Sequence, residues 1–125
     1  MQLITTHLEL LLPRESELVL CKYLNLANNF DIRKLWPCTV VKLDNQFILG
    51  DGHHRAYYFN LRGMLEIPIM ILENDSEVKQ CNDGAFYYFD NLGEFIEDYK
   101  RFRKPILDKC RIRQIKDYTF PTRNC

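Results

Sequence analysis

The chain has 125 residues, of which 46 % are hydrophobic and 27 % are charged, and its formal net charge is zero. This length and composition indicate one globular domain, because two full domains would not fit. No apolar run approaches the roughly 18 residues of a membrane helix, and the first residues lack the basic leader of a signal peptide. We therefore expect a cytoplasmic protein with no membrane partner.

In chain order, the pattern of apolar residues predicts a compact β-α-β-β-α-β unit over residues 8–74. Its first strand covers residues 7–13 and stops at a proline. A helix over residues 14–29 follows, because apolar residues recur at helical spacing and acidic residues occupy the first turn. The next element is a β-branched strand over residues 38–43.

The second half of this unit begins with a tight turn at residues 44–46, which pairs the β-branched strand with apolar residues 47–50. Residues 51–63 predict a helix that ends at a glycine. Residues 67–74 predict a buried strand without alternation.

Beyond this strand the pattern is weaker. We expect a turn at residues 82–84 and a strand over residues 85–89. A helix over residues 91–104 is expected to end before Pro105, because proline cannot continue the hydrogen-bond ladder. Residues 106–120 fit no single element.

Charge is distributed unevenly along the chain. Residues 1–98 carry 8 lysines and arginines against 15 acidic residues, whereas residues 99–125 carry 9 against 2. We therefore expect a domain over residues 1–98 and a basic C-terminal extension over residues 99–125. Such an extension either contacts nucleic acid or docks on the acidic part of its own chain or of a neighbouring subunit. Docking is favoured, because it neutralises both parts at once.

The five cysteines are odd in number, and no two have the C-x-x-C spacing typical of zinc or redox sites. A zinc site built from them is therefore not expected. We interpret them as buried or unreactive thiols, which suits the cytoplasm.

The segment DGHHR joins the second strand of the predicted hairpin to the next helix. Asp51 has the residue type of a helix N-cap, and Gly52 lets the backbone come close to a ligand. The free N–H groups of the first turn and the positive end of the helix dipole then point outward together, which favours phosphate. Arg55 adds a planar fork of donors, and His53 and His54 add donors that titrate near neutral pH.

Two other interpretations of this segment remain open. In the first, Asp51 only caps the helix and both histidines lie at the surface. In the second, the histidines bind a structural metal, although adjacent helical residues point about 100° apart and do not easily share one ion. The third histidine, His7, is too isolated to assign.

The residues ILGDGHHRAYYFNLRGMLEIPIMIL resemble the signature region of the ParB/sulfiredoxin-like superfamily. The preceding LELLLPRESELVLCKYL and LWPCTVVKLDNQF match, in order, the opening strand, helix and hairpin of that family, so the resemblance covers roughly residues 3–75. It implies an α+β fold with a small mixed sheet and, here, a helical C-terminal extension. It also implies that the turn from glycine to arginine binds nucleotide phosphates.

Features of this sequence discriminate between branches of the superfamily. Sulfiredoxins carry a reactive cysteine immediately before the His-Arg pair; His53 occupies that place here, so sulfinic-acid reduction by that chemistry is excluded. Partition proteins tend to carry Glu-Arg-Arg after the glycine, followed by a DNA-binding helical domain, whereas only about 50 residues follow here. The free-serine-kinase-like branch shows DGHHR itself. That branch places a catalytic glutamate just after the first strand, where Glu15 falls, with Glu17 two residues away.

This match implies binding of ATP or ADP and phosphoryl transfer to a small hydroxyl substrate. The backbone amides of Gly52 and His53, with Arg55, would hold the phosphates, and Asp51 would hold Mg²⁺. His54 would contact the transferring group. The matched glutamate would accept the hydroxyl proton; its alternative role is that of an ordinary first-turn helix carboxylate.

One residue departs from the family pattern. Tyr58 occupies the third position after Arg55, where a small residue is usual, and this change would alter or block the nucleotide pocket. The alternative function is a non-enzymatic module that senses a nucleotide and contacts nucleic acid through the extension. The basic residues available for such contacts are Lys100, Arg101, Arg103, Lys104, Lys109, Arg111 and Arg113, interleaved with Tyr99, Phe102 and Tyr118.

Overall fold

The computed structural model describes residues 1–29, 36–119, 121 and 123. The strands are β1 (Gln2–His7), β2 (Leu11–Leu12), β3 (Cys38–Leu43), β4 (Gln46–Asp51) and β5 (Glu66–Leu72). The α-helices are α1 (Leu20–Asn29), α2 (His53–Leu61), α3 (Asp75–Gln80), α4 (Leu92–Asp98) and α5 (Lys104–Lys109). Short 3₁₀ turns are η1 (Leu8–Leu10), η3 (Gly84–Tyr88) and η5 (Ile115–Asp117), and η4 (Tyr99–Arg103) is π-helical. None of the described helices is long and apolar enough to cross a membrane.

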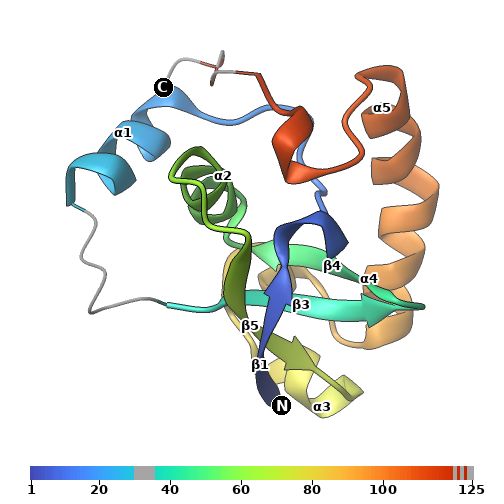
Figure 1. Cartoon of the computed structure of the whole chain (residues 1–125). Helices are drawn as coiled ribbons and strands as arrows, with labels where there is room; N and C mark the ends of the chain where they lie inside the picture. The colour runs from blue at the N-terminus through green and yellow to red at the C-terminus, as the bar shows by residue number, and fades with distance from the viewer. Residues whose placement is uncertain (30–35, 120, 122, 124–125) are drawn as a thin grey trace.

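The five strands form one mixed sheet in the order β1-β5-β3-β4-β2, with helices on both sides of it (Figure 1). β1 pairs antiparallel with β5, and β3 pairs antiparallel with β4 as the predicted hairpin. The β3–β5 and β2–β4 pairs are parallel. The mixed sheet with its helices confirms the prediction of an α+β fold.

Both faces of the sheet are buried, because successive side chains of a strand point to opposite faces. Val40 and Leu49 are paired across β3 and β4 and belong to one hydrophobic cluster, whereas the neighbouring pair of Val41 and Ile48 belongs to a second. Helix α2 and residues 107–118 complete the first cluster. Elements α3, η3 and α4 complete the second.

The C-terminal extension contributes to this core. Its buried side chains include Tyr99, Leu107, Ile112, Ile115 and Tyr118. The seven basic residues singled out above are all exposed. The boundary expected at residue 98 falls within a continuous helical run from α4 through η4 to α5. Residues 120, 122, 124 and 125 of the extension lie outside the described residues.

Two elements near the N-terminus differ from the prediction in extent. The strand predicted over residues 7–13 is interrupted by η1, so that β1 ends at His7 and β2 has only two residues. The helix predicted over residues 14–29 begins only at Leu20. The backbone amides of residues 14 and 19 donate instead to side chains of α2, which holds the intervening segment in a non-helical loop.

The strand predicted over residues 85–89 is wrong, because this segment forms the 3₁₀ turn η3 and a short connection. Aromatic residues favour strands, but tertiary packing decides here. Phe86 stacks on Phe95 with ring centroids 4.6 Å apart. A Cβ at Gly50 would come within 2.2 Å of the Phe86 ring, so the turn packs closely on the backbone of β4.

The helix predicted to end before Pro105 continues to Lys109. A proline inside a helix lacks the N–H donor and crowds the carbonyl four residues earlier. The π-helical turn η4 lies directly before the proline and widens the helix there. The helical axis therefore continues past a residue that usually stops it.

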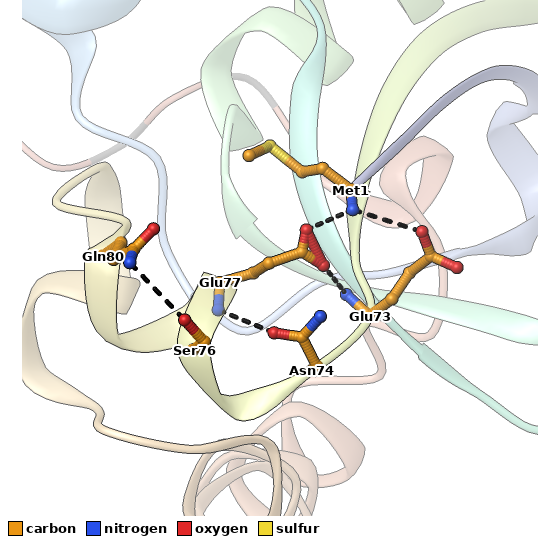
Figure 2. Close-up of polar contacts among 6 residues, drawn as sticks. All are labelled: Met1, Glu73, Asn74, Ser76, Glu77 and Gln80. Atoms are coloured by element: carbon orange, nitrogen blue, oxygen red, sulfur yellow. Dashed lines mark hydrogen bonds and ion pairs between the residues drawn. The ribbon is translucent and has the colours of Figure 1, made fainter.

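Helix α3 has no counterpart among the predicted elements, although its start carries a capping signal. Asn74 caps the helix by accepting a hydrogen bond from the Glu77 amide at 2.9 Å, and the Glu77 carboxylate accepts one from the Glu73 amide at 3.0 Å (Figure 2). The amino group of Met1 lies between the Glu73 and Glu77 carboxylates, 3.2 Å from the former (Figure 2). The ion pairs of the Met1 amino group therefore hold the residue before β1 against the start of α3.

The cysteines differ from one another. Cys38, Cys81 and Cys110 carry free thiols, whereas Cys21 is disulfide-bonded, so the prediction of unpaired thiols is wrong for Cys21. Burial raises the pKa of the Cys38 thiol to about 12. This thiol therefore stays protonated at neutral pH and is a poor nucleophile.

Candidate active site

A cleft of about 960 Å³ opens beside the junction of β4 and α2. It is lined by all six residues that the sequence assigns to the site, which are Glu15, Asp51, Gly52, His53, His54 and Arg55. Glu17, the alternative to Glu15, lines a separate pocket of about 240 Å³. Four charged residues that the sequence analysis did not single out for this site also line the cleft: Arg14, Lys22, Asp98 and Arg103.

The junction turns at Gly52, whose φ of 108° lies in the left-handed region that favours glycine. A Cβ at this position would stand 2.6 Å from the Cys38 sulfur, so no other residue fits without displacing its neighbour. Gly52 itself is the N-cap of α2, and a glycine has no side chain with which to cap the helix. The predicted capping role of Asp51 is therefore wrong, and the backbone N–H groups of the first turn are donors of the kind that favours anions.

Asp51 is paired with Arg55 instead of with the helix amides. The Arg55 Nη2 donates to Asp51 Oδ2 at 2.9 Å, and its Nη1 donates to the carbonyl oxygens of Trp36 at 3.0 Å and Pro37 at 3.3 Å. The guanidinium therefore has a fixed orientation at the edge of the cleft. Protein acceptors therefore already engage both terminal nitrogens of the fork, and an anionic ligand would use the remaining N–H groups.

The two histidines accept hydrogen bonds from the loop that carries Glu15. His53 Nε2 accepts from the Arg14 amide at 2.8 Å, and His54 Nε2 accepts from the Val19 amide at 2.9 Å. Burial lowers the pKa of His53 to about 3 and also lowers the pKa of His54. The expectation that both titrate near neutral pH is therefore wrong for His53, which is buried and neutral.

Glu15 lies in this loop, five residues before α1 begins, so it is not a first-turn helix carboxylate. It is accessible to solvent at the cleft. Desolvation by the surrounding protein raises its pKa, and the neighbouring cations Lys22, Arg14 and Arg103 oppose this rise. A raised pKa is a property that carboxylates acting as general bases often have.

An ion pair between a buried arginine and a partly exposed aspartate forms one wall of the cleft. Arg14 is only 5 % exposed, and its Nη2 lies 2.5 Å from Asp98 Oδ2, while its guanidinium packs over the rings of Phe89 and Phe95 at 5.5 and 5.0 Å from their centroids. Arg103 approaches the same carboxylate oxygen at 3.6 Å. Local sequence patterns carry no signal of this pair, because its partners are 84 residues apart.

The described residues contain no group of three or more His, Cys, Asp or Glu side chains that could hold a metal ion. Asp51 is the junction carboxylate that lines the cleft, and one of its oxygens is paired with Arg55. His7 lies on β1 with its Nε2 3.4 Å from the Glu66 carboxylate, and it does not line the cleft. A structural metal held by the histidines therefore has no support in this part of the chain.

Tyr58 does not line the cleft. It packs against the first hydrophobic cluster, and the Arg62 guanidinium lies 5.8 Å from its ring centroid. The departure from the family pattern at this position therefore does not obstruct the cleft.

Comparisons of the chain with models of protein families, with curated proteins and with solved structures find no match. Membership of the ParB/sulfiredoxin-like superfamily therefore remains a proposal that depends on the residues and geometry of the site.

Proposed function

We propose that the chain is a ParB/sulfiredoxin-like protein that binds the phosphates of ATP or ADP and transfers a phosphoryl group to a small hydroxyl substrate. The observation that carries this proposal is that one cleft contains both Glu15 and the N-terminus of α2 at Gly52. A helix N-terminus binds anions, and a desolvated carboxylate accepts protons. Phosphoryl transfer needs both groups within reach of one ligand.

The phosphates bind at the backbone amides of Gly52 and His53, with the Arg55 guanidinium beside them. Lys22 and Arg103 line the same cleft and add positive charge. His54 contacts the transferring group through Nδ1, because its Nε2 already accepts the hydrogen bond from the loop. Positioning and charge neutralisation of this kind supply most of the catalysis in phosphoryl transfer.

Glu15 accepts the proton of the substrate hydroxyl while that oxygen forms a bond to phosphorus. The bond from phosphorus to the bridging oxygen of the nucleotide breaks, and its electron pair leaves with the nucleotide. The raised pKa of Glu15 brings its basicity closer to neutral pH, which favours this proton transfer.

Mg²⁺ would neutralise phosphate charge when it is bound with the nucleotide. Asp51 is the residue that would hold it. One carboxylate is enough, because Mg²⁺ in such sites takes its other ligands from phosphates and water.

Replacement of Arg55 by alanine tests the phosphate site. Arg55→Ala is expected to weaken ATP and ADP binding at least tenfold, about 1.4 kcal/mol, because a charge-assisted donor is lost. The melting temperature is also expected to fall somewhat, since Arg55 bonds the Trp36 and Pro37 carbonyls. Isothermal titration calorimetry on the folded variant measures the affinity.

Arg62→Ala is the matched control, because Arg62 ends the same helix and does not line the cleft. Arg55→Lys separates charge from the planar fork and is expected to restore only part of the affinity. Equal nucleotide affinity in the wild type and in Arg55→Ala would remove Arg55 from the site. No nucleotide binding by the wild type would refute the proposed function.

A second candidate function is a nucleotide-sensing module that contacts nucleic acid, and the exposure of the seven basic side chains of the extension favours it. Binding to DNA or RNA is then expected to weaken steeply as salt rises. Replacing Lys109, Arg111 and Arg113 together by alanine is expected to reduce the salt slope, because fewer phosphates are neutralised. None of the three residues lines the cleft. Electrophoretic or fluorescence titrations at several salt concentrations measure this, and salt-independent or undetectable binding would exclude it.

A further inference from the structure

The loop that carries Glu15 has no regular secondary structure of its own and is held from two sides. On one side, the rings of His53 and His54 accept the amides of Arg14 and Val19. The other side is the C-terminal extension. A short non-helical segment with a functional carboxylate depends on such outside contacts for its position.

Two contacts join the extension to this loop or to the start of α1, and a third joins the loop to the neighbouring helix α4. The Tyr118 hydroxyl donates a hydrogen bond to the backbone carbonyl of Glu15, across 103 residues of sequence. The amide of Leu20 donates to the carbonyl of Arg123 at 2.8 Å. The buried pair of Arg14 and Asp98 attaches the loop to α4.

Tyr118 is itself firmly placed. Its side chain is buried, and its ring packs edge-on against Tyr57 of α2 with the ring centroids 6.3 Å apart. The preceding turn η5 is closed by Asp117, whose carboxylate accepts from the Arg113 and Gln114 amides at 2.9 Å each. These contacts restrain the Tyr118 side chain, so its hydroxyl is a donor with a fixed position.

We infer that Tyr118 is a positioning residue for Glu15, and that the extension is part of the site because it fixes the backbone from which the Glu15 carboxylate reaches the cleft. This inference rests on the proposed function only in naming Glu15 as the general base. The hydrogen bond goes to the Glu15 carbonyl, so it sets the backbone position and leaves the carboxylate free to react. A displacement of about 1 Å at a reacting group costs on the order of 10²-fold in rate.

Tyr118→Phe tests the inference, because it keeps the buried ring and removes only the hydroxyl. We expect phosphoryl transfer to fall by roughly 10- to 100-fold with little change in nucleotide affinity. Two readouts need no activity. Amide hydrogen exchange of Arg14 and Val19 is expected to speed up severalfold, and the Glu15 pKa, followed by carboxyl carbon NMR, is expected to fall towards its ordinary value as the carboxylate moves away from the protein groups that desolvate it.

Tyr99→Phe is the matched control, since Tyr99 is a buried tyrosine of the same extension that packs in the second cluster. It is expected to leave both NMR readouts as in the wild type. If Tyr118→Phe gives wild-type exchange at Arg14 and Val19 and a wild-type Glu15 pKa, the inference is overturned. If the wild type transfers no phosphate, the proposed function fails, but the two NMR readouts still decide whether Tyr118 positions Glu15.

Discussion

Glu15→Gln is expected to lower the rate of phosphoryl transfer by about 10²- to 10⁴-fold, because glutamine keeps the size of the side chain and cannot accept the hydroxyl proton. Nucleotide affinity is expected to stay unchanged, since the proposed phosphate site is at Gly52 and not at Glu15. The loss should therefore appear in kcat and not in the nucleotide Kd. Steady-state kinetics with a hydroxyl acceptor, serine first, and calorimetry on the same variant measure the two quantities.

Glu17→Gln is the matched control, because it makes the same chemical change two residues away in a separate pocket. It is expected to keep wild-type activity. The rate should also fall as pH decreases through the Glu15 pKa, which desolvation raises from its ordinary value, because protonation removes the base. Full activity of Glu15→Gln, or an equal loss in both variants, would contradict the assignment of the base.

Asp98→Ala is expected to destabilise the protein by about 3 kcal/mol, because it leaves the buried Arg14 guanidinium without its ionic partner. The same substitution at Asp108 is the matched control. Asp108 pairs with Lys104 at 3.1 Å in the same helical run, but both side chains are exposed. Asp108→Ala is therefore expected to cost less than about 1 kcal/mol. Urea denaturation followed by circular dichroism measures both free energies of unfolding.

A double variant separates the ion pair from other effects of the Asp98 substitution. Arg14→Met together with Asp98→Ala removes both charges and keeps apolar bulk against Phe89 and Phe95. The double variant is expected to be more stable than Asp98→Ala alone, because no unpaired charge stays buried. Equal losses in Asp98→Ala and Asp108→Ala would show that the buried pair has no special role.

The features that could be predicted from the sequence are the local ones. The hairpin of β3 and β4 follows from a β-branched run and a tight turn, and the start of α2 follows from the glycine junction. The hypothesis of an anion site at that junction needs only the chain between Asp51 and Arg55, and it stays a prediction. The sequence alone indicates Asp51 instead of Gly52 as the N-cap of α2. The choice between these two residues depends on the φ angle of Gly52 and on the pairing of Asp51 with Arg55, which the sequence does not show.

The features that could not be predicted depend on distant partners. His53 and His54 accept hydrogen bonds from amides 39 and 35 residues away. The residue type alone indicates a donor or a ligand, and it does not indicate that these rings hold a distant loop in place. The wall formed by Arg14 and Asp98 and the contact from Tyr118 to Glu15 join the two ends of the chain. Local propensity also fails at η3 and Pro105, where packing of Phe86 and a π-helical turn determine the conformation.

The most direct test of the central claim is an NMR titration of the amide protons with ATP and, separately, with adenosine. If phosphates bind at the N-terminus of α2, the amide signals of Gly52, His53 and His54 are expected to shift most with ATP and to stay in place with adenosine, because only ATP carries the phosphates. If ATP leaves these three amides unshifted, or if its shifts gather on residues away from the cleft, the phosphate site proposed here is wrong.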